Sequence, residues 1–212
     1  MNLEKRLAPM ELPKLTEAGP KSPGIISGYA LKFNTVYNLG FCDETISPNA
    51  FFGANLNDVR CLFNHDPSLI LGRNKAGTLK LTLDGVGLFY RCELPDSPNG
   101  INIREAVRRK DVDQSSWSFF LKESGADDWE KKPGKKPLRI ITGVDIVFDV
   151  SPVTFPANPA ATAGWNDSLT ARKSFEVWEA KKSGKPGVKL DFIGERLKMY
   201  HDQMMMDQLL YV

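Results

Sequence analysis

Three serine hydroxyls lie among large aromatic residues in the segment DQSSWSFF, residues 113–120. They belong to Ser115, Ser116 and Ser118. A serine hydroxyl becomes a nucleophile for acyl transfer when a neighbouring base removes its proton and a third group orients that base. The segment therefore raises the question of whether the chain also supplies a base and an acidic partner.

Histidine is the usual base in such a set, and the chain holds 2 histidines. His201 lies among Asp and Met near the end of the chain, which is typical of a solvated helix face. His65 follows a strand candidate in CLFNHDPS, where a strand running into a turn can present a side chain from a rigid base. An ordinary turn histidine is the alternative. A metal site is not indicated, because no second His or Cys stands at ligand spacing.

An acidic partner can come from VDIVFDVSPVTFPANP, residues 144–159. If this segment is a strand, Asp145 and Asp149 share a face with Val147. A carboxylate among apolar residues is costly unless it is paired, and a histidine ring N–H is a suitable partner. A Ser–His–carboxylate set needs no closeness in sequence, so both aspartates are candidates.

Strand alternation separates the three serines. If DQSSWSFF is a strand, Ser115 shares a face with Trp117 and Phe119, which is the pattern of a core-facing side. Ser116 and Ser118 then share the opposite face. Alternation disfavours Ser115 and leaves the other two open, with a solvated strand face as the alternative explanation of their polarity.

The elements that would position these residues are mostly short strands. The tight-turn pair Asp84-Gly85 separates two alternating runs and predicts a hairpin over residues 78–94. One helix is predicted after Ser97 and a second over residues 46–56. These elements favour a β-rich α+β fold, a small β-barrel surrounded by a few helices. The strand candidates span residues 24–38, 59–64, 78–83, 86–93, 115–121 and 138–150.

The chain divides into four parts by composition. Residues 1–23 read as a flexible lead-in, residues 24–163 as the folded body, and residues 164–188 as a small and polar linker. Residues 189–212 read as an amphipathic helix that either docks on the body or pairs with another chain. Its apolar positions, spaced three and four apart, are Leu190, Ile193, Leu197, Tyr200 and Met204.

The bulk properties exclude some partners. With 28 Lys and Arg against 26 Asp and Glu, the formal net charge is +2, which disfavours a nucleic-acid-binding barrel or a membrane-surface protein. The 3 cysteines contain no CxxC pair and are expected to be reduced thiols in a cytoplasm-like compartment. We also expect a soluble chain, because the sequence shows neither a secretory segment nor a long apolar run.

Six segments in order resemble the prohead proteases of tailed bacteriophages, whose fold is similar to that of herpesvirus assemblin. The resemblance covers roughly residues 24–163, which would then be the protease domain. The segments are GYALKFNTVYN, ETISPNAFF, DVRCLFNHDPSLILGR, GTLKLTLDGVGLFYRCELPDS, DQSSWSFF and FDVSPVTFPANPAA.

The resemblance implies a role for individual residues. His65 stands at the place of the catalytic histidine, and Ser116 at that of the catalytic serine in the family's S-F-G-F segment. Ser118 then occupies a position that is usually Gly or Ala. Asp149 falls where the family has Glu, so its side chain is one methylene shorter, and Asp145 remains a competitor for the third place.

The implied activity is acyl transfer that needs no cofactor. His65 would take the proton from Ser116, and the carboxylate would orient the imidazole. Backbone N–H groups, Arg73 or Arg139 would stabilise the oxyanion. The alternative is an inactive family member that acts as a non-enzymatic capsid-assembly or scaffold protein. That alternative would rest on the departures from the motifs at Asn49, Trp117 and Asp149.

The resemblance also implies partners and a location. Substrates would be the scaffold or major capsid protein precursor, portal-associated internal proteins, and the ends of the chain itself through self-cleavage. The enzyme would act inside the procapsid in the host cytoplasm, without a membrane or a specific nucleic acid. By analogy with assemblin, it would form a dimer.

Overall fold

A computed structural model describes residues 3–7, 14–16, 24–123, 126–154 and 164–184. Within these residues the strands form three sheets, and the β-rich α+β class is confirmed. Each described sheet has two free ends in its strand order, so none of them closes on itself as the expected small barrel would.

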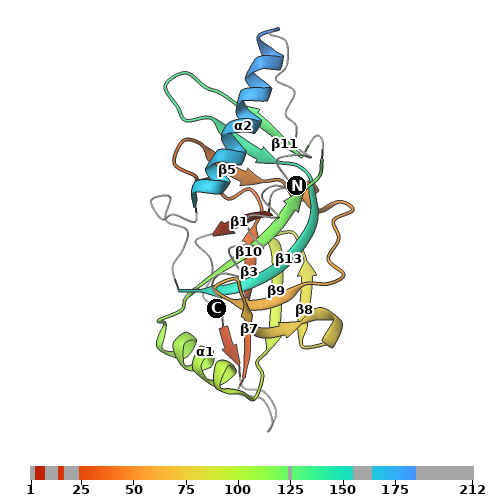
Figure 1. Ribbon diagram of the computed structural model, residues 1–212, viewed down its shortest axis with the longest axis vertical. Coiled ribbons are helices and arrows are strands. Elements are labelled where there is room, and N and C mark those ends of the chain that lie inside the picture. The colour runs from red at the N-terminus through yellow and green to blue at the C-terminus, as the bar shows by residue number, and fades with distance from the viewer. Residues whose placement is uncertain (1–2, 8–13, 17–23, 124–125, 155–163, 185–212) are drawn as a thin grey trace, which may run out of the picture.

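The first sheet carries the candidate site and has the strand order β1-β10-β13-β6-β7. β10 pairs antiparallel with both β1 and β13, β13 pairs parallel with β6, and β6 and β7 form a hairpin. The long strands β10 and β13 cross the middle of the molecule side by side (Figure 1). The bounds are β1 (Leu3–Leu7), β10 (Gln114–Leu121), β13 (Val144–Val153), β6 (Arg60–Phe63) and β7 (Asp66–Arg73).

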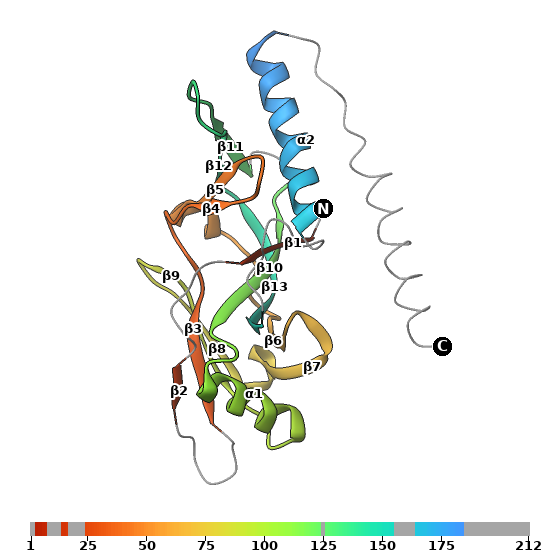
Figure 2. The same ribbon diagram turned by 90° about the vertical axis from the view of Figure 1, so that its left-hand side faces the viewer.

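The second sheet has the order β2-β3-β9-β8 and packs against the first, with β3 in contact with β10 (Figure 2). The hairpin predicted around Asp84-Gly85 is confirmed as β8 and β9, and the Asp84 carboxylate accepts hydrogen bonds from the backbone N–H groups of Val86 and Gly87. The bounds are β2 (Lys14–Thr16), β3 (Ile25–Lys32), β9 (Gly87–Glu93) and β8 (Leu79–Leu83).

The third sheet lies at the end of the molecule near helix α2 (Gly164–Lys182) (Figure 1). α2 occupies most of the range predicted as a linker, so that prediction was wrong for these residues. The reason is tertiary packing, because Phe175 and Trp178 pack with Phe41 and Trp129. The small and polar composition of the segment does not indicate these contacts. The strands, in order, are β11 (Asp127–Glu130), β12 (Leu138–Ile141), β5 (Asp43–Ile46) and β4 (Tyr37–Asn38).

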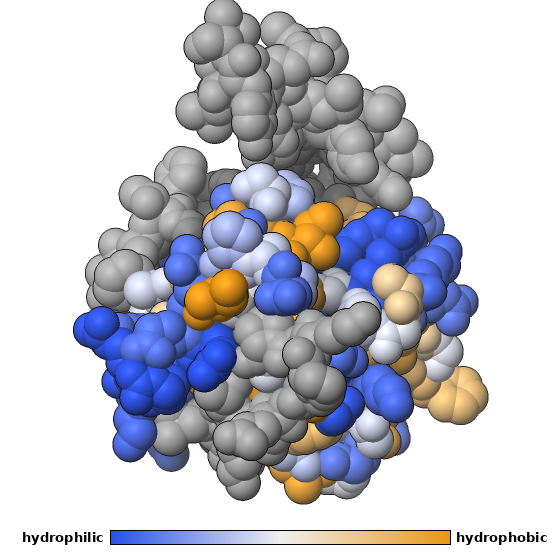
Figure 3. Space-filling view, turned by 90° about the horizontal axis from the view of Figure 1, so that it is seen from below, coloured by the Kyte–Doolittle hydropathy of each residue, from blue (hydrophilic) through white to orange (hydrophobic). Residues whose placement is uncertain are grey.

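Helix α1 (Pro98–Arg109) lies at the opposite end and confirms the prediction after Ser97, which caps it. The second predicted helix is present only as the 3₁₀ turn η1 (Pro48–Phe51), capped by Ser47. A further 3₁₀ turn, η2 (Asn74–Ala76), follows β7. Seen from the α1 end, the apolar residues in the described surface occur in small groups among hydrophilic ones (Figure 3).

The N-terminal range also differs from its prediction, because β1 and β2 both lie within residues 1–23. Each pairs with a neighbouring strand, β1 with β10 and β2 with β3, so these residues are not a free lead-in. The predicted C-terminal helix, residues 189–212, lies outside the described residues, as does His201.

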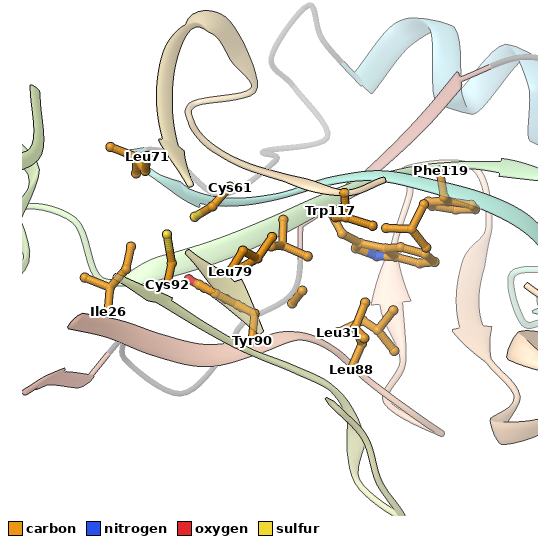
Figure 4. Packing of buried hydrophobic residues seen from close by; sticks show 14 of the residues in the cluster. Ile26, Leu31, Cys61, Leu71, Leu79, Leu88, Tyr90, Cys92, Trp117 and Phe119 are labelled. Atoms are coloured by element: carbon orange, nitrogen blue, oxygen red, sulfur yellow. The ribbon is translucent and has the colours of Figure 1, made fainter. Parts of the chain in front are cut away.

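The main core lies between the first two sheets. Trp117 and Phe119 are fully buried, and their rings stack with centroids 3.8 Å apart (Figure 4). Ser115 is buried on the same side of β10, where its hydroxyl is 2.7 Å from the Tyr90 hydroxyl. The core face expected from alternation is therefore present, and it fixes which way the hydroxyls of Ser116 and Ser118 point.

Candidate active site

His65 is presented by the two-residue turn between β6 and β7. Asn64 and His65 both have left-handed backbone conformations, with φ of 54° and 60°. Such conformations are uncommon outside glycine, although Asn and His adopt them more readily than most residues. Strained backbone of this kind persists only where the surroundings hold it in place.

Asn64 supplies that support by three hydrogen bonds to the end of β13. Its backbone N–H donates to the Pro152 carbonyl at 3.1 Å. Its side-chain amide donates to Thr154 Oγ1 at 3.1 Å and accepts from the Thr154 backbone N–H at 2.8 Å. The histidine turn is thus tied to the strand that carries Asp149.

The imidazole of His65 bridges Ser116 and Asp149. Nε2 lies 2.6 Å from Ser116 Oγ, and Nδ1 lies 2.6 Å from Asp149 Oδ1. Because an ionised carboxylate only accepts hydrogen bonds, Nδ1 carries the proton and Nε2 is free to accept the one from Ser116. The structure therefore brings together the three residues that the resemblance singled out, from β10, β13 and the β6–β7 turn.

Ser118 and Asp145 have other surroundings. The Ser118 hydroxyl donates to Asp149 Oδ2, whereas the two imidazole nitrogens of His65 bond with Asp149 Oδ1 and Ser116 Oγ. Asp145, half-buried at the start of β13, accepts a hydrogen bond from the Asn55 backbone N–H through its own carbonyl. Of the two serines and two aspartates that alternation left open, the structure places Ser116 and Asp149 beside His65.

The Asp149 carboxylate is buried, with 7% of its side chain exposed. Burial alone would raise its pKa, but hydrogen bonds from His65, Ser118 and Ser151 hold the pKa below its ordinary value. Ser151 Oγ donates to Oδ1 at 2.5 Å. The carboxylate is therefore ionised near neutral pH, as the orientation of the imidazole requires. Sequence reasoning missed Ser118 and Ser151 as donors, although Ser151 stands two residues after Asp149 and so shares its face of a strand.

The two arginines suggested for the oxyanion are engaged by carboxylates elsewhere. Arg73 makes a bidentate pair with Asp58, at 2.7 and 2.8 Å. Arg139 contacts Asp127 and Glu44 in the third sheet. Neither contact involves the Ser116 region, which favours backbone N–H groups as the oxyanion donors.

The cysteines are free thiols, and all are buried. Burial, together with the nearby Cys92 thiol and the Asp149 charge, raises the pKa of Cys61 well above its ordinary value. Cys61 and Cys92 lie close together in the core (Figure 4). A protonated, buried thiol is a poor nucleophile, so Cys61 does not compete with Ser116. In the described residues no group of three or more His, Cys, Asp or Glu could hold a metal ion.

The family model of the caudovirus prohead serine protease matches residues 11–175. The chain belongs to this family. Among solved structures, the capsid assembly protease gp21 of bacteriophage T4 is similar over 73% of this chain and 98% of its own, with 11% identity and a TM-score of 0.47. A search of curated proteins found no match. No helix in the described part of the chain is long and apolar enough to cross a membrane.

Proposed function

We propose that the chain is the serine endopeptidase of capsid maturation, with Ser116 as nucleophile, His65 as base and Asp149 as the orienting carboxylate. The observation that supports this most is the position of the His65 ring, 2.6 Å from both the Ser116 hydroxyl and the Asp149 carboxylate. These distances are those of a nucleophile, a base and an orienting group ready for acyl transfer.

In the proposed mechanism, His65 Nε2 takes the proton of Ser116 Oγ as that oxygen bonds to the scissile carbonyl carbon. Asp149 stabilises the imidazolium that forms. When the tetrahedral intermediate collapses, the C–N bond breaks and Nε2 gives its proton to the leaving amine. Water then attacks the acyl-serine with His65 again as base, which releases the acid product and restores the hydroxyl. Each step uses only residues of this chain, and no cofactor is invoked.

The Asp in place of the family's Glu is accommodated by its neighbours. Asp149 reaches His65 while Ser118 and Ser151 donate to it, so a buried carboxylate is fully hydrogen-bonded. Ser118 stands where Gly or Ala is usual in the family, and its hydroxyl donates a hydrogen bond to the shorter Asp149 side chain. The Trp117 ring packs in the core and stacks on Phe119, although its buried indole N–H has no hydrogen-bond partner among the described residues. These contacts favour an active enzyme over the inactive assembly protein.

The substrates we propose are segments of the major capsid protein precursor or scaffold, cleaved inside the procapsid in the host cytoplasm. Portal-associated internal proteins, self-cleavage of the chain's own ends, and a dimer remain proposals of the same kind. The substrates and the self-cleavage rest on membership of the prohead protease family, and the dimer rests on the analogy with assemblin alone.

Co-expression of the chain with its capsid precursor tests this function. Wild type is expected to convert the precursor to a shorter product, and Ser116→Ala to leave it at full length. Ser183→Ala is the matched control, because Ser183 is exposed and bonds only to backbone carbonyls at the end of α2. Cleavage by Ser116→Ala at the wild-type rate would rule out the assignment.

A further inference from the structure

The strand beside the nucleophile's own strand comes from the N-terminal residues. β1 pairs antiparallel with β10, in a register that sets Leu7 opposite Ser116, Arg6 opposite Trp117 and Lys5 opposite Ser118. Both views show β1 beside β10, near the middle of the molecule (Figures 1 and 2). Paired Cα atoms in an antiparallel ladder are about 4.5–5.5 Å apart, so the backbone at Leu7 passes close to Ser116.

A substrate peptide could pair with β10 on only one of its two sides, the side that now pairs with β1. The opposite side of β10 is bonded along its length to β13, which carries Asp149. β1 is the last strand in the order of this sheet, so its place is the edge of the sheet. An extended peptide that pairs with β10 near the nucleophile must therefore take the place of β1.

Ser116 has no exposed surface, with a relative exposure of 0%. A scissile carbonyl must come within bonding distance of its Oγ, so some segment has to move before a substrate in another chain is cut. β1 is the described segment that runs beside Ser116 at a sheet edge.

We propose that the edge of β10 beside Ser116 is the binding site for an extended substrate peptide, and that residues 3–7 fill this site as an intramolecular inhibitor. The proposal rests on the function proposed above. The ligand is recognised mainly through backbone hydrogen bonds, as when a peptide adds a strand to a sheet edge. Leu7 takes the place of the substrate residue nearest the nucleophile.

Two features make β1 a replaceable strand. It is only 5 residues long, and it lies before residues 11–175, the part that matches the family. β2, which pairs with β3, anchors the chain shortly after β1. A segment tethered in this way competes for the edge of β10 at an effective concentration of about millimolar. It therefore excludes a substrate peptide until the local concentration of that peptide is also about millimolar. The crowded interior of a procapsid supplies that condition.

Point variants of the full chain test this directly. Backbone N–H groups alternate in direction along an edge strand, so one of Lys5→Pro and Arg6→Pro removes a donor to β10 and both distort the strand. Lys5→Ala and Arg6→Ala are the matched controls, because they change the side chain and keep the N–H. The readout is the rate at which a serine-directed fluorophosphonate modifies Ser116, located by mass spectrometry.

At least one proline variant is expected to be labelled about tenfold faster than wild type or more, because the tethered competitor is released. Both alanine variants should be labelled at the wild-type rate. A synthetic peptide of residues 1–12, added at millimolar concentration, should slow labelling of the faster variant again. Equal rates in all five proteins, or slower labelling of both proline variants that keep the wild-type melting temperature, would overturn the inhibitor proposal.

The two proposals fail in different ways. If no protein in the series is labelled at Ser116, the proposed protease function is wrong. If all are labelled at Ser116 at one rate, the function stands and the role of residues 3–7 is wrong. Loss of the fold in both proline variants, seen as a lowered melting temperature with slow labelling, would show that β1 is a structural strand and so overturn the inhibitor role.

Discussion

Two clusters of buried charge lie in different sheets and differ in what they can do. In the first sheet, His65 links the Asp149 carboxylate to the Ser116 hydroxyl. In the third, the Arg139 guanidinium, 1% exposed, contacts Asp127 at 2.6 Å and Glu44 at 3.1 Å. An arginine holds its proton at every physiological pH, whereas a histidine can give and take one.

The groups that surround the two clusters differ as well. Ser174 of α2 donates to Asp127 and accepts from the Trp129 indole, so the Arg139 cluster fastens α2 to the third sheet. The His65 cluster instead ends on the Ser116 hydroxyl, on the strand that pairs with β1. Burial of charge by itself therefore does not mark a catalytic site. The proposed catalytic role of the His65 cluster rests instead on a proton-accepting group held between a carboxylate and a hydroxyl.

The largest expected effect separates catalysis from stability. Asp149→Asn keeps the shape of the side chain but favours the wrong imidazole tautomer, and should lower kcat by about 10⁴-fold. The measurement is cleavage of the capsid precursor, with the melting temperature as a check that the fold is intact. A variant with half of the wild-type activity would show that Asp149 is not the orienting group.

In the other cluster the effect should fall on stability. Arg139→Met leaves the buried Glu44 carboxylate without its guanidinium partner and should cost about 3–5 kcal/mol of unfolding free energy, measured in urea. Lys132→Met is the control, because Lys132 pairs with Glu130 on the surface at 3.5 Å, and its loss should cost at most about 1 kcal/mol. Equal costs for both variants would contradict the structural role of Arg139.

A smaller effect is expected from the turn that presents His65. Asn64→Gly keeps the left-handed backbone but removes both side-chain bonds to Thr154, so the imidazole should lose its position. A misplacement of about 1 Å costs roughly 10²-fold in rate, and it should appear in kcat with KM unchanged. Asn34→Gly is the control, because Asn34 has the same backbone conformation, with φ of 55°. If the two variants have the same kcat, Asn64 does not position the histidine.

The smallest effect concerns pH. The pKa of Asp149 is lowered in the folded protein, so its ionisation contributes stability that is present above the unfolded pKa of about 3.9 and is lost as pH falls through the lower folded pKa. Ser151→Ala removes a donor, which should raise the folded pKa and reduce the stability gained above pH 4. Urea unfolding of wild type and variant from pH 3 to pH 7 measures this, and parallel profiles would contradict it.

Sequence alone could predict the residues of the candidate site better than the hydrogen bonds that hold those residues in position. The choice of His65 and Ser116 follows from residue chemistry, strand alternation and the resemblance to prohead proteases. The bonds from Asn64 to Thr154, 90 residues away, could not be predicted, because they depend on how β13 pairs with β6. Strand pairing over such distances decides contacts that no local pattern records.

The same limit applies to the fold. The β8–β9 hairpin and α1 were predictable, because turn and cap residues act locally. β1 was not, since five residues of mixed charge show no strand alternation and gain their structure from β10. α2 was also missed, because contacts of Phe175 and Trp178 with the third sheet decide its place. The division into three sheets likewise depends on pairing between distant strands.

The most direct test of the site is the position of a single covalent adduct. We expect a serine-directed fluorophosphonate to modify Ser116 alone in the folded chain, and to modify nothing in the His65→Ala variant, because the hydroxyl then has no base. Peptide mapping by mass spectrometry locates the adduct. An adduct on Ser118 instead of Ser116, or undiminished labelling of Ser116 without His65, would contradict the account.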